Sequence, residues 1–234
     1  MKLLETHDRI TELNFTIKEV TDYMPKVMAG GFHGIIINIT NPCDIVTRQI
    51  AKIAKLPKGH VFGTGTGLDT SRLLSALSMQ TDIDPKSITA YMLGEHGADI
   101  MVPMSQIAFR GKSVASLQND ERFRFDTKQL KEKVFEGAWV TFDGKKCTEY
   151  GICSTLARDV SIIFHNEKAI MPVSMELDGE YNEKDIFVGV PAIVSANGVE
   201  EVIELDLTKE EMEEFHQCCE GVRHNMTLND LIIK

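Results

Sequence analysis

Three residues in the middle of the sequence have the types and spacing of an acid–base site. Asp69 and Arg72 stand three residues apart in a segment with helical periodicity, so their side chains share one helix face. His96 stands between two glycines in residues 93–97, directly after an apolar segment, where the backbone can turn sharply and expose the imidazole. Taken alone, Asp69 and Arg72 would be interpreted as a surface ion pair that contributes at most about 1 kcal/mol to stability. Taken alone, His96 would be interpreted as an ordinary loop residue.

Taken together, the three residues predict a site for proton transfer on a small carboxylic acid. The carboxylate of Asp69 can hold one nitrogen of the His96 imidazole and fix its tautomer, which leaves the other nitrogen to give or take a proton. Arg72, one helical turn from that carboxylate, can bind a substrate carboxylate through two parallel hydrogen bonds. We therefore expect the three side chains to converge around one cavity.

The elements that precede these residues predict a parallel α/β fold. Apolar residues recur at helical spacing over residues 9–28, and residues 34–40 form a nearly continuous apolar run typical of a strand covered on both faces. A second helix is expected up to residue 55, with Asn41 as its cap, and residues 60–63 read as another strand. A right-handed βαβ unit begins with a strand, so the order predicts the C-terminal part of a Rossmann (doubly wound parallel) sheet.

The rest of the chain predicts an α+β domain with an antiparallel sheet. Helices are expected at 68–80, 127–139 and 148–166, an extended segment at 88–93, a hairpin at 102–117, strands near 170–177, 185–194 and 199–205, and a final helix opened by the capping box at 208–211. We predict a truncated dinucleotide-binding domain over residues 1–63 and a catalytic domain over residues 64–234. Residues 63–67 read as a flexible crossover between them, because the GxGxxG pattern would need a glycine at Leu68.

Two further polar residues are candidates for the same site. Arg9 begins the first helix, where a guanidinium could polarise a carbonyl, although a solvated first-turn residue is the simpler interpretation. Asn41 follows a buried strand, where open α/β sheets bind ligands, and it could also serve as the helix cap. The remaining histidines, including His216 beside two cysteines, predict no further constellation and no metal site.

Composition narrows the classes of partner. The formal net charge of −10 argues against nucleic acid and anionic membranes, and no apolar run approaches the roughly 20 residues of a membrane helix. The first residues become charged too soon for a secretory signal, and the five cysteines are odd in number without CxxC spacing. We expect a cytoplasmic protein without a disulfide framework.

At this point the sequence resembles the L-lactate/malate dehydrogenase family. The resemblance covers nearly the whole chain and is carried by four blocks whose order and spacing match the family: Asp8-Arg9, Asn41-Pro42-Cys43-Asp44, residues 63–72 (GTGTGLDTSR) and Gly94-Glu95-His96-Gly97. Residues 11–16 and 31–34 are most similar to its L-2-hydroxyisocaproate dehydrogenase branch.

The resemblance implies hydride transfer between NAD and a 2-hydroxy or 2-oxo acid, in a homodimer or homotetramer. His96 would be the proton donor and acceptor and Asp69 its orienting carboxylate. Arg72 would bind the substrate carboxylate, and Arg9 would polarise the reacting carbonyl from a mobile loop. Asn41 would contact substrate and nicotinamide, and Thr148 would line the substrate pocket. NAD supplies the hydride, and the protein supplies orientation and the proton.

The sequence also departs from the family pattern. The glycine-rich fingerprint and the acidic residue that reads the adenosine ribose are absent, and Leu74 and Thr89 replace the basic residues of members activated by a sugar bisphosphate. That regulation is therefore not expected. Lactate, branched 2-oxo acids and malate remain open as substrates. The alternative function is a catalytically inactive fragment or assembly module, because half a parallel sheet would expose an apolar strand edge near residues 35–39.

Overall fold

The computed structural model describes the backbone of residues 9–230 and the side chains of residues 13–227. Its helices are α1 (Arg9–Ala29), α2 (Cys43–Ala54), α3 (Gly67–Thr81), α4 (Thr127–Lys145), α5 (Glu149–His165) and α6 (Lys209–Asp230). Its strands are β1 (Ile36–Asn38), β2 (Val61–Gly63), β3 (Ile88–Thr89), β4 (Leu93–Gly94), β5 (Ile100–Met101), β6 (Ala108–Phe109), β7 (Lys112–Ser113), β8 (Ala169–Asp178), β9 (Lys184–Ser195) and β10 (Gly198–Val202). Short 3-10 turns lie at Pro85–Ser87, Met104–Gln106, Val114–Leu117, Glu121–Phe123 and Glu180–Asn182.

The main sheet joins a parallel pair of strands to an antiparallel part. β1 and β2 are parallel, with Ile37 opposite Phe62. β2 then pairs antiparallel with β8 at Gly63 and Ser174, and the order continues through β9 and β4 to β5, with β10 on β9. The α/β fold class is confirmed: a parallel beginning is followed by an antiparallel half, within one continuous sheet.

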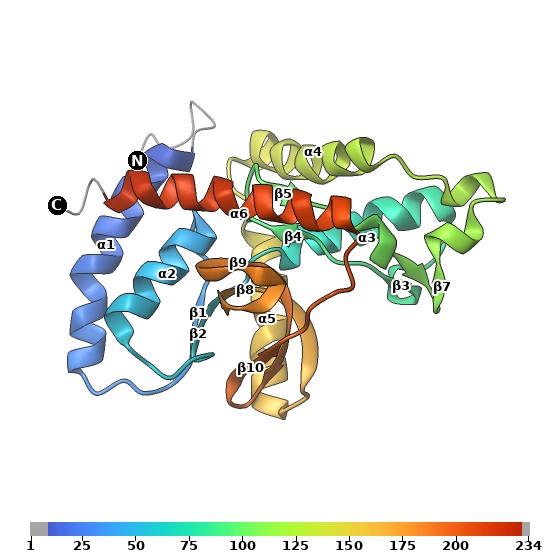
Figure 1. The fold of residues 1–234 in the computed structure, drawn as a ribbon. Coiled ribbons are helices and arrows are strands. Elements are labelled where there is room, and N and C mark those ends of the chain that lie inside the picture. Colours follow the sequence, from blue (N-terminus) through green and yellow to red (C-terminus); the bar gives the residue numbers. More distant parts are fainter. Residues whose placement is uncertain (1–8, 231–234) are drawn as a thin grey trace.

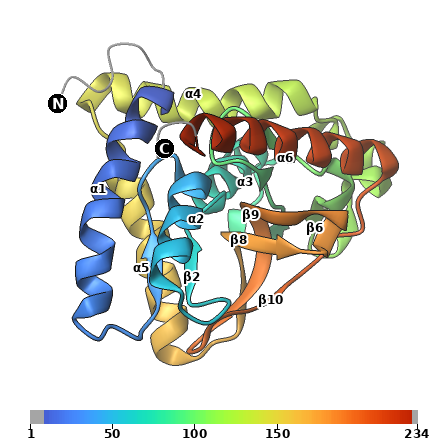
Figure 2. The same cartoon turned by 60° about the vertical axis from the view of Figure 1, so that its left-hand side comes forward.

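Helices cover both faces of this sheet. β9 is buried along most of its length, which requires cover on both sides. α2 and α6 contact it, and α5 contacts it as well. In Figure 1, α2 and α6 lie toward the viewer and α5 lies behind β8 and β9. Figure 2 shows α1 packed outside α2, as the outermost helix on that side.

A second hydrophobic cluster places α4 across α3. Leu73 and Leu77 of α3 are fully buried in it, and Leu130 and Val134 of α4 are buried beside them. The C-terminal part of α4 then runs past Arg72: a Cβ placed on Gly137 would lie 3.8 Å from Arg72 Cδ. The packing of two amphipathic helices thus brings α4 next to the predicted site.

The segment at residues 63–67 is tightly packed, so the prediction of a flexible crossover is wrong. All five of its residues are buried. Gly65 has φ +47°, and a Cβ there would lie 2.4 Å from the backbone nitrogen of Ser174. The glycine thus permits a close approach between this segment and β8.

The start of α2 corrects the predicted role of Asn41 as a helix cap. The helix begins at Cys43, and no side-chain cap hydrogen bond is formed at its N-terminus. Asn38 supports this turn instead, since its Nδ2 donates to the carbonyl oxygens of Thr40 and Cys43, each at 3.1 Å, and to Thr47 Oγ1 at 3.0 Å. Asn38 is 4% exposed, so these bonds satisfy a buried amide.

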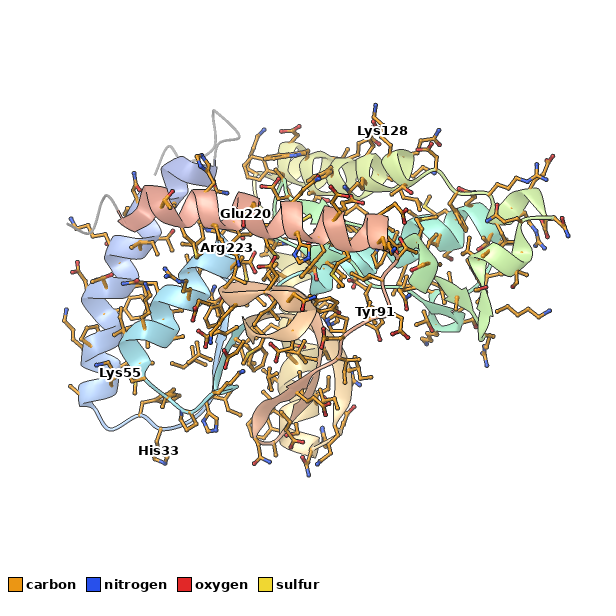
Figure 3. All side chains as sticks on the ribbon, viewed as in Figure 1. His33, Lys55, Tyr91, Lys128, Glu220 and Arg223 are labelled. Carbon is orange, nitrogen blue, oxygen red and sulfur yellow. The ribbon has the colours of Figure 1, made fainter. Side chains whose placement is uncertain are left out.

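α6 is tied to the β8–β9 turn by a buried carboxylate. Glu183 Oε1 lies 2.5 Å from His216 Nδ1, and Arg223 donates to its other oxygen. Arg223 also bonds Glu220 at 2.7 Å, and Figure 3 labels both on α6. The expectation that His216 belongs to no constellation is wrong, because its carboxylate partner lies 33 residues away in the sequence.

Two predicted local motifs are confirmed. The hairpin of β6 and β7 turns at Arg110 and Gly111, both with positive φ. The capping box closes as expected, with Thr208 Oγ1 accepting from the Glu211 nitrogen at 3.2 Å and Glu211 Oε2 accepting from the Thr208 nitrogen at 2.9 Å. Strand β5 was not predicted, because two residues are too few for a periodic pattern.

β1 forms one end of the strand order, so its outer edge lies at the border of the sheet. Ile36 and Ile37 are only half-buried there, and Ile39 is 39% exposed. This agrees with the predicted apolar strand edge. Within residues 9–230, no helix is both long and apolar enough to cross a membrane.

Candidate active site

The predicted histidine–aspartate pair forms. Asp69 lies in the first turn of α3, and His96 lies in the loop that joins β4 to β5. His96 Nδ1 is 2.5 Å from Asp69 Oδ2, a distance at which the ring N–H donates to the carboxylate. The Asp69 side chain is 8% exposed and that of His96 13%, so the pair is largely shielded from water. With Nδ1 engaged, Nε2 is the nitrogen left for proton transfer.

The second oxygen of the same carboxylate holds the predicted arginine. Arg72 Nη1 donates to Asp69 Oδ1 at 3.1 Å, and the two residues are three apart on α3. The pair is not a solvated surface pair, as the two residues taken alone would suggest, since the side chains are 18% and 8% exposed. Asp69 therefore fixes the positions of an imidazole and a guanidinium at once, and it does so from one helical turn.

All three side chains line one cavity of about 430 Å³. Asp69, Arg72 and His96 contribute charged side chains to its lining, and much of the rest of the lining is apolar. That apolar lining comes from α1, α2 and α4: Leu13, Pro42, Ile45, Val134, Phe135, Ala138 and Trp139. The remaining lining residues come from the loop after β4 and from α6: Glu95, Gly97, Ala98, Asp99 and Asn225. The arrangement suits a small anion with an apolar substituent.

A smaller cavity of about 80 Å³ adjoins the first, because Arg72 and His96 line both. Asn41 and Thr148 are among its polar lining residues. Thr148 immediately precedes α5 without forming a side-chain cap hydrogen bond. The structure thus brings five of the six predicted site residues around two adjoining cavities.

The sixth predicted residue is Arg9. It begins α1, but its side chain lies outside the described residues, so its place in the site stays a prediction.

The backbone N–H of His96 donates a hydrogen bond to a buried carboxylate. Asp44, in the first turn of α2, accepts from the His96 nitrogen at 2.9 Å and from Ser174 Oγ at 2.5 Å. Burial raises the pKa of Asp44 to about 7; the hydrogen bond from Ser174 lowers it and the nearby Glu95 carboxylate raises it. Burial likewise raises the pKa of Glu95, which accepts from Asn225 Nδ2 at 3.3 Å.

Sequence reasoning did not find several of these residues. Asp44 ends the Asn41-Pro42-Cys43-Asp44 motif, but only its contact with His96, 52 residues away, gives it a place in the site. Trp139 and Phe135 reach the cavity because α4 packs on α3, and Asn225 because α6 crosses above β4. Their helical periodicity was readable, but the identity of their partner was not.

The residues around the smaller cavity would suit the nicotinamide end of the NAD that the resemblance implies, but not its phosphates. The cavity follows the carboxyl ends of β1 and β2, where open α/β sheets bind ligands, and it combines the amide of Asn41 and the hydroxyl of Thr148 with apolar Ile39 and Ile152. The 234 residues contain no GxGxxG loop for the phosphates. No group of three histidine, cysteine or acidic side chains in the described part of the chain could hold a metal ion.

Comparisons with known proteins agree with this geometry. Residues 66–229 match the family described as the lactate/malate dehydrogenase alpha/beta C-terminal domain. The L-lactate dehydrogenase of Fusobacterium nucleatum is 40% identical over 220 residues, which is 93% of this chain and 69% of that protein.

Solved structures are similar over the same extent. A lactate dehydrogenase from a Medee basin deep-sea metagenome library superposes with a TM-score of 0.89 at 31% identity, over 94% of this chain and 71% of that one. A malate dehydrogenase from Aeropyrum pernix gives a TM-score of 0.83 at 28% identity, over 92% of this chain and 72% of that one.

Proposed function

Because this chain belongs to the lactate/malate dehydrogenase family, we propose that it is an NAD-dependent, L-lactate-type dehydrogenase that interconverts an L-2-hydroxy acid and its 2-oxo acid. The observation that carries the proposal is the convergence of His96, Asp69 and Arg72 on one largely apolar cavity. The names of the relatives, L-lactate and malate dehydrogenases, support the same reaction class.

The histidine supplies the proton. In reduction of the 2-oxo acid, Nε2 of protonated His96 donates to the carbonyl oxygen, and in the reverse direction it accepts the hydroxyl proton. The carboxylate of Asp69, 2.5 Å from Nδ1, fixes the ring orientation and stabilises the imidazolium. Asn41 and Thr148 would hold the nicotinamide end of NAD, which would supply the hydride chemistry when bound.

The arginine supplies orientation. Arg72 is anchored by Asp69, so its guanidinium is fixed relative to the imidazole of His96. A substrate carboxylate bound by Arg72 would present the adjacent 2-oxo or 2-hydroxy carbon to His96, as a short, rigid acid requires. Arg9 is proposed to polarise the reacting carbonyl.

The cavity supports lactate or a longer apolar homologue over malate. Arg72 is the sole arginine or lysine among its described lining residues, so the described part of the cavity offers a second substrate carboxylate no second arginine or lysine. Glu95 and Asp99 line the same cavity and would repel it. Apolar Phe135 and Trp139 instead suit an alkyl or branched side chain. Malate stays the alternative substrate.

The enzymatic proposal is tested by turnover. Purified protein with NADH and a series of 2-oxo acids (pyruvate, 4-methyl-2-oxopentanoate, oxaloacetate) should lose the absorbance of reduced nicotinamide, and His96→Ala should abolish the loss. An exposed histidine on another element, His165→Ala, should leave the rate unchanged. Soluble, folded protein without turnover on any of these acids would reject the proposal.

An inactive remnant or assembly module is the second candidate, favoured by the apolar edge of β1. A remnant should show no rise in melting temperature with NAD, because a ligand stabilises only a state that binds it. A clear rise in melting temperature, together with turnover, excludes the remnant.

We also propose that residues 1–63 are the end of a dinucleotide-binding domain and that residues 64–234 are the catalytic domain. Copies of the chain are proposed to assemble as a homodimer or homotetramer in the cytoplasm.

A further inference from the structure

The backbone of the loop that carries His96 contains glycines, which allow many conformations, so a hydrogen bond is needed to fix its position. Glycines flank the Glu95-His96 pair, and Gly94 has φ +100°. The imidazole itself is bonded to Asp69, but that bond fixes only the far end of the side chain. The position of the ring therefore depends also on where the backbone of His96 is held.

That anchor is the carboxylate of Asp44. Its Oδ2 accepts the N–H of His96 at 2.9 Å, and its Oδ1 accepts the hydroxyl of Ser174 at 2.5 Å. Asp44 is 1% exposed and Ser174 is fully buried, so water does not compete for either bond. One side chain thus joins α2, the His96 loop and β8.

The segment just before α2 carries the nicotinamide side of the site. Asn41 lies three residues before Asp44 and lines the smaller cavity together with His96. Because Asp44 bonds the His96 backbone directly, it sets the spacing between Asn41 and the imidazole. The two parts of the site come from segments 52 residues apart, and this bond connects them.

We propose, resting on the dehydrogenase function above, that Asp44 is a positioning residue for His96, and that its carboxylate keeps the imidazole in line with the substrate. In the structure both carboxylate oxygens act as acceptors, Oδ2 for the His96 N–H and Oδ1 for the Ser174 O–H. The bond to the His96 N–H needs only one of these oxygens, and the Ser174 hydroxyl can also accept. The titratable groups that face Asp44 are Cys43, Glu95, His96 and Cys219.

Three variants separate positioning from packing. Asp44→Ala removes both acceptors and should lower kcat by about ten- to a hundredfold with KM changed less than about twofold. Asp44→Asn keeps one amide oxygen for the His96 N–H, while its NH₂ group can donate to Ser174, so kcat should stay within about fivefold of the wild type. Ser195→Ala is the control, since it removes another serine–carboxylate bond, from the buried Ser195 Oγ to the exposed Glu200 at 2.6 Å, at the end of β9, and should leave kcat unchanged.

Hydrogen exchange of the His96 amide gives a readout that needs no turnover. Asp44→Ala should speed exchange at His96 by about a hundredfold relative to Met101 of β5, and Asp44→Asn should retain the protection. If Asp44→Ala does not fold, Ser174→Ala takes its place and should speed the same amide severalfold, because it loosens the carboxylate.

The outcomes are separable. Wild-type kcat in folded Asp44→Ala, or unchanged His96 exchange in that variant or its Ser174→Ala substitute, would overturn the proposal. Equal loss of activity in Asp44→Ala and Asp44→Asn would overturn it as well, since charge rather than position would then matter. If the wild type shows no turnover, the dehydrogenase function fails, while amide exchange still decides whether Asp44 holds His96.

Discussion

Asp159 on α5 offers a test of the buried electrostatics of this fold. Its side chain is 1% exposed, and neither carboxylate oxygen has a hydrogen-bond partner. Burial raises its pKa from 3.8 to about 7, with the Arg158 charge acting in the opposite direction. The native state therefore binds the proton more tightly than the unfolded chain does. The contribution of Asp159 to the free energy of unfolding is fully present below about pH 4 and is lost as pH rises towards 7.

The size of this effect follows from the shift. About three pKa units at 1.36 kcal/mol each amount to about 4 kcal/mol lost from the free energy of unfolding once the group is ionised, of which roughly 2.5 kcal/mol falls between pH 5 and pH 8. Asp159→Leu replaces the carboxylate with an apolar group of the same branching. The stability gap between this variant and the wild type should widen by about 2.5 kcal/mol over that pH range.

The assay is urea unfolding of both proteins at four pH values from 5 to 8. Buried Asp44 titrates near the same pH in both proteins, so its contribution cancels in the difference. Asp143→Leu changes an exposed aspartate on α4 and should give a gap that does not vary with pH. A gap for Asp159→Leu that stays constant across the range would refute the reasoning, because the carboxyl would then not be buried without partners.

Three further substitutions test the site and its support. Asp69→Asn keeps the shape but loses the charge that stabilises the imidazolium of His96, so kcat should fall by about a hundredfold or more in steady-state assays. Arg72→Lys keeps the charge but loses the planar fork, so KM for the 2-oxo acid should rise by about tenfold. Gly65→Ala places a Cβ 2.4 Å from the Ser174 nitrogen at φ +47°, so urea unfolding should show a loss of at least about 2 kcal/mol.

A control variant tests the Gly65→Ala prediction, and a specific outcome would contradict each of the other two. Gly111→Ala also places an alanine at a positive φ, +84°, but with no atom within 4 Å of the new Cβ, so it should cost only about 1 kcal/mol. A cost equal to that of Gly65→Ala would contradict the argument from close approach. For Arg72→Lys, a change in kcat alone with unchanged KM would contradict a role in carboxylate binding. For Asp69→Asn, wild-type kcat would remove Asp69 from the mechanism.

The sequence alone determined the elements and the local geometry of the site. Apolar spacing, turn residues and a capping box predicted six helices whose starts lie close to the observed ones, although α4 continues past the predicted end at residue 139 to Lys145. The three-residue spacing of Asp69 and Arg72 placed both on one face of α3. Such features depend on neighbours within a turn or two, so they are readable from order alone. Where local alternatives compete, the sequence was ambiguous: Asn38, rather than Asn41, supports the start of α2.

The tertiary structure alone decided which distant residues meet. His96 lies 27 residues from Asp69 and 52 from Asp44, and no periodicity links either pair. The packing of two hydrophobic cores decides that β2 pairs antiparallel with β8 and that α4 lies beside Arg72. Packing depends on the joint fit of many side chains, so it brings Asp69, Arg72, His96 and Asp44 into one site that their separate sequence positions do not specify.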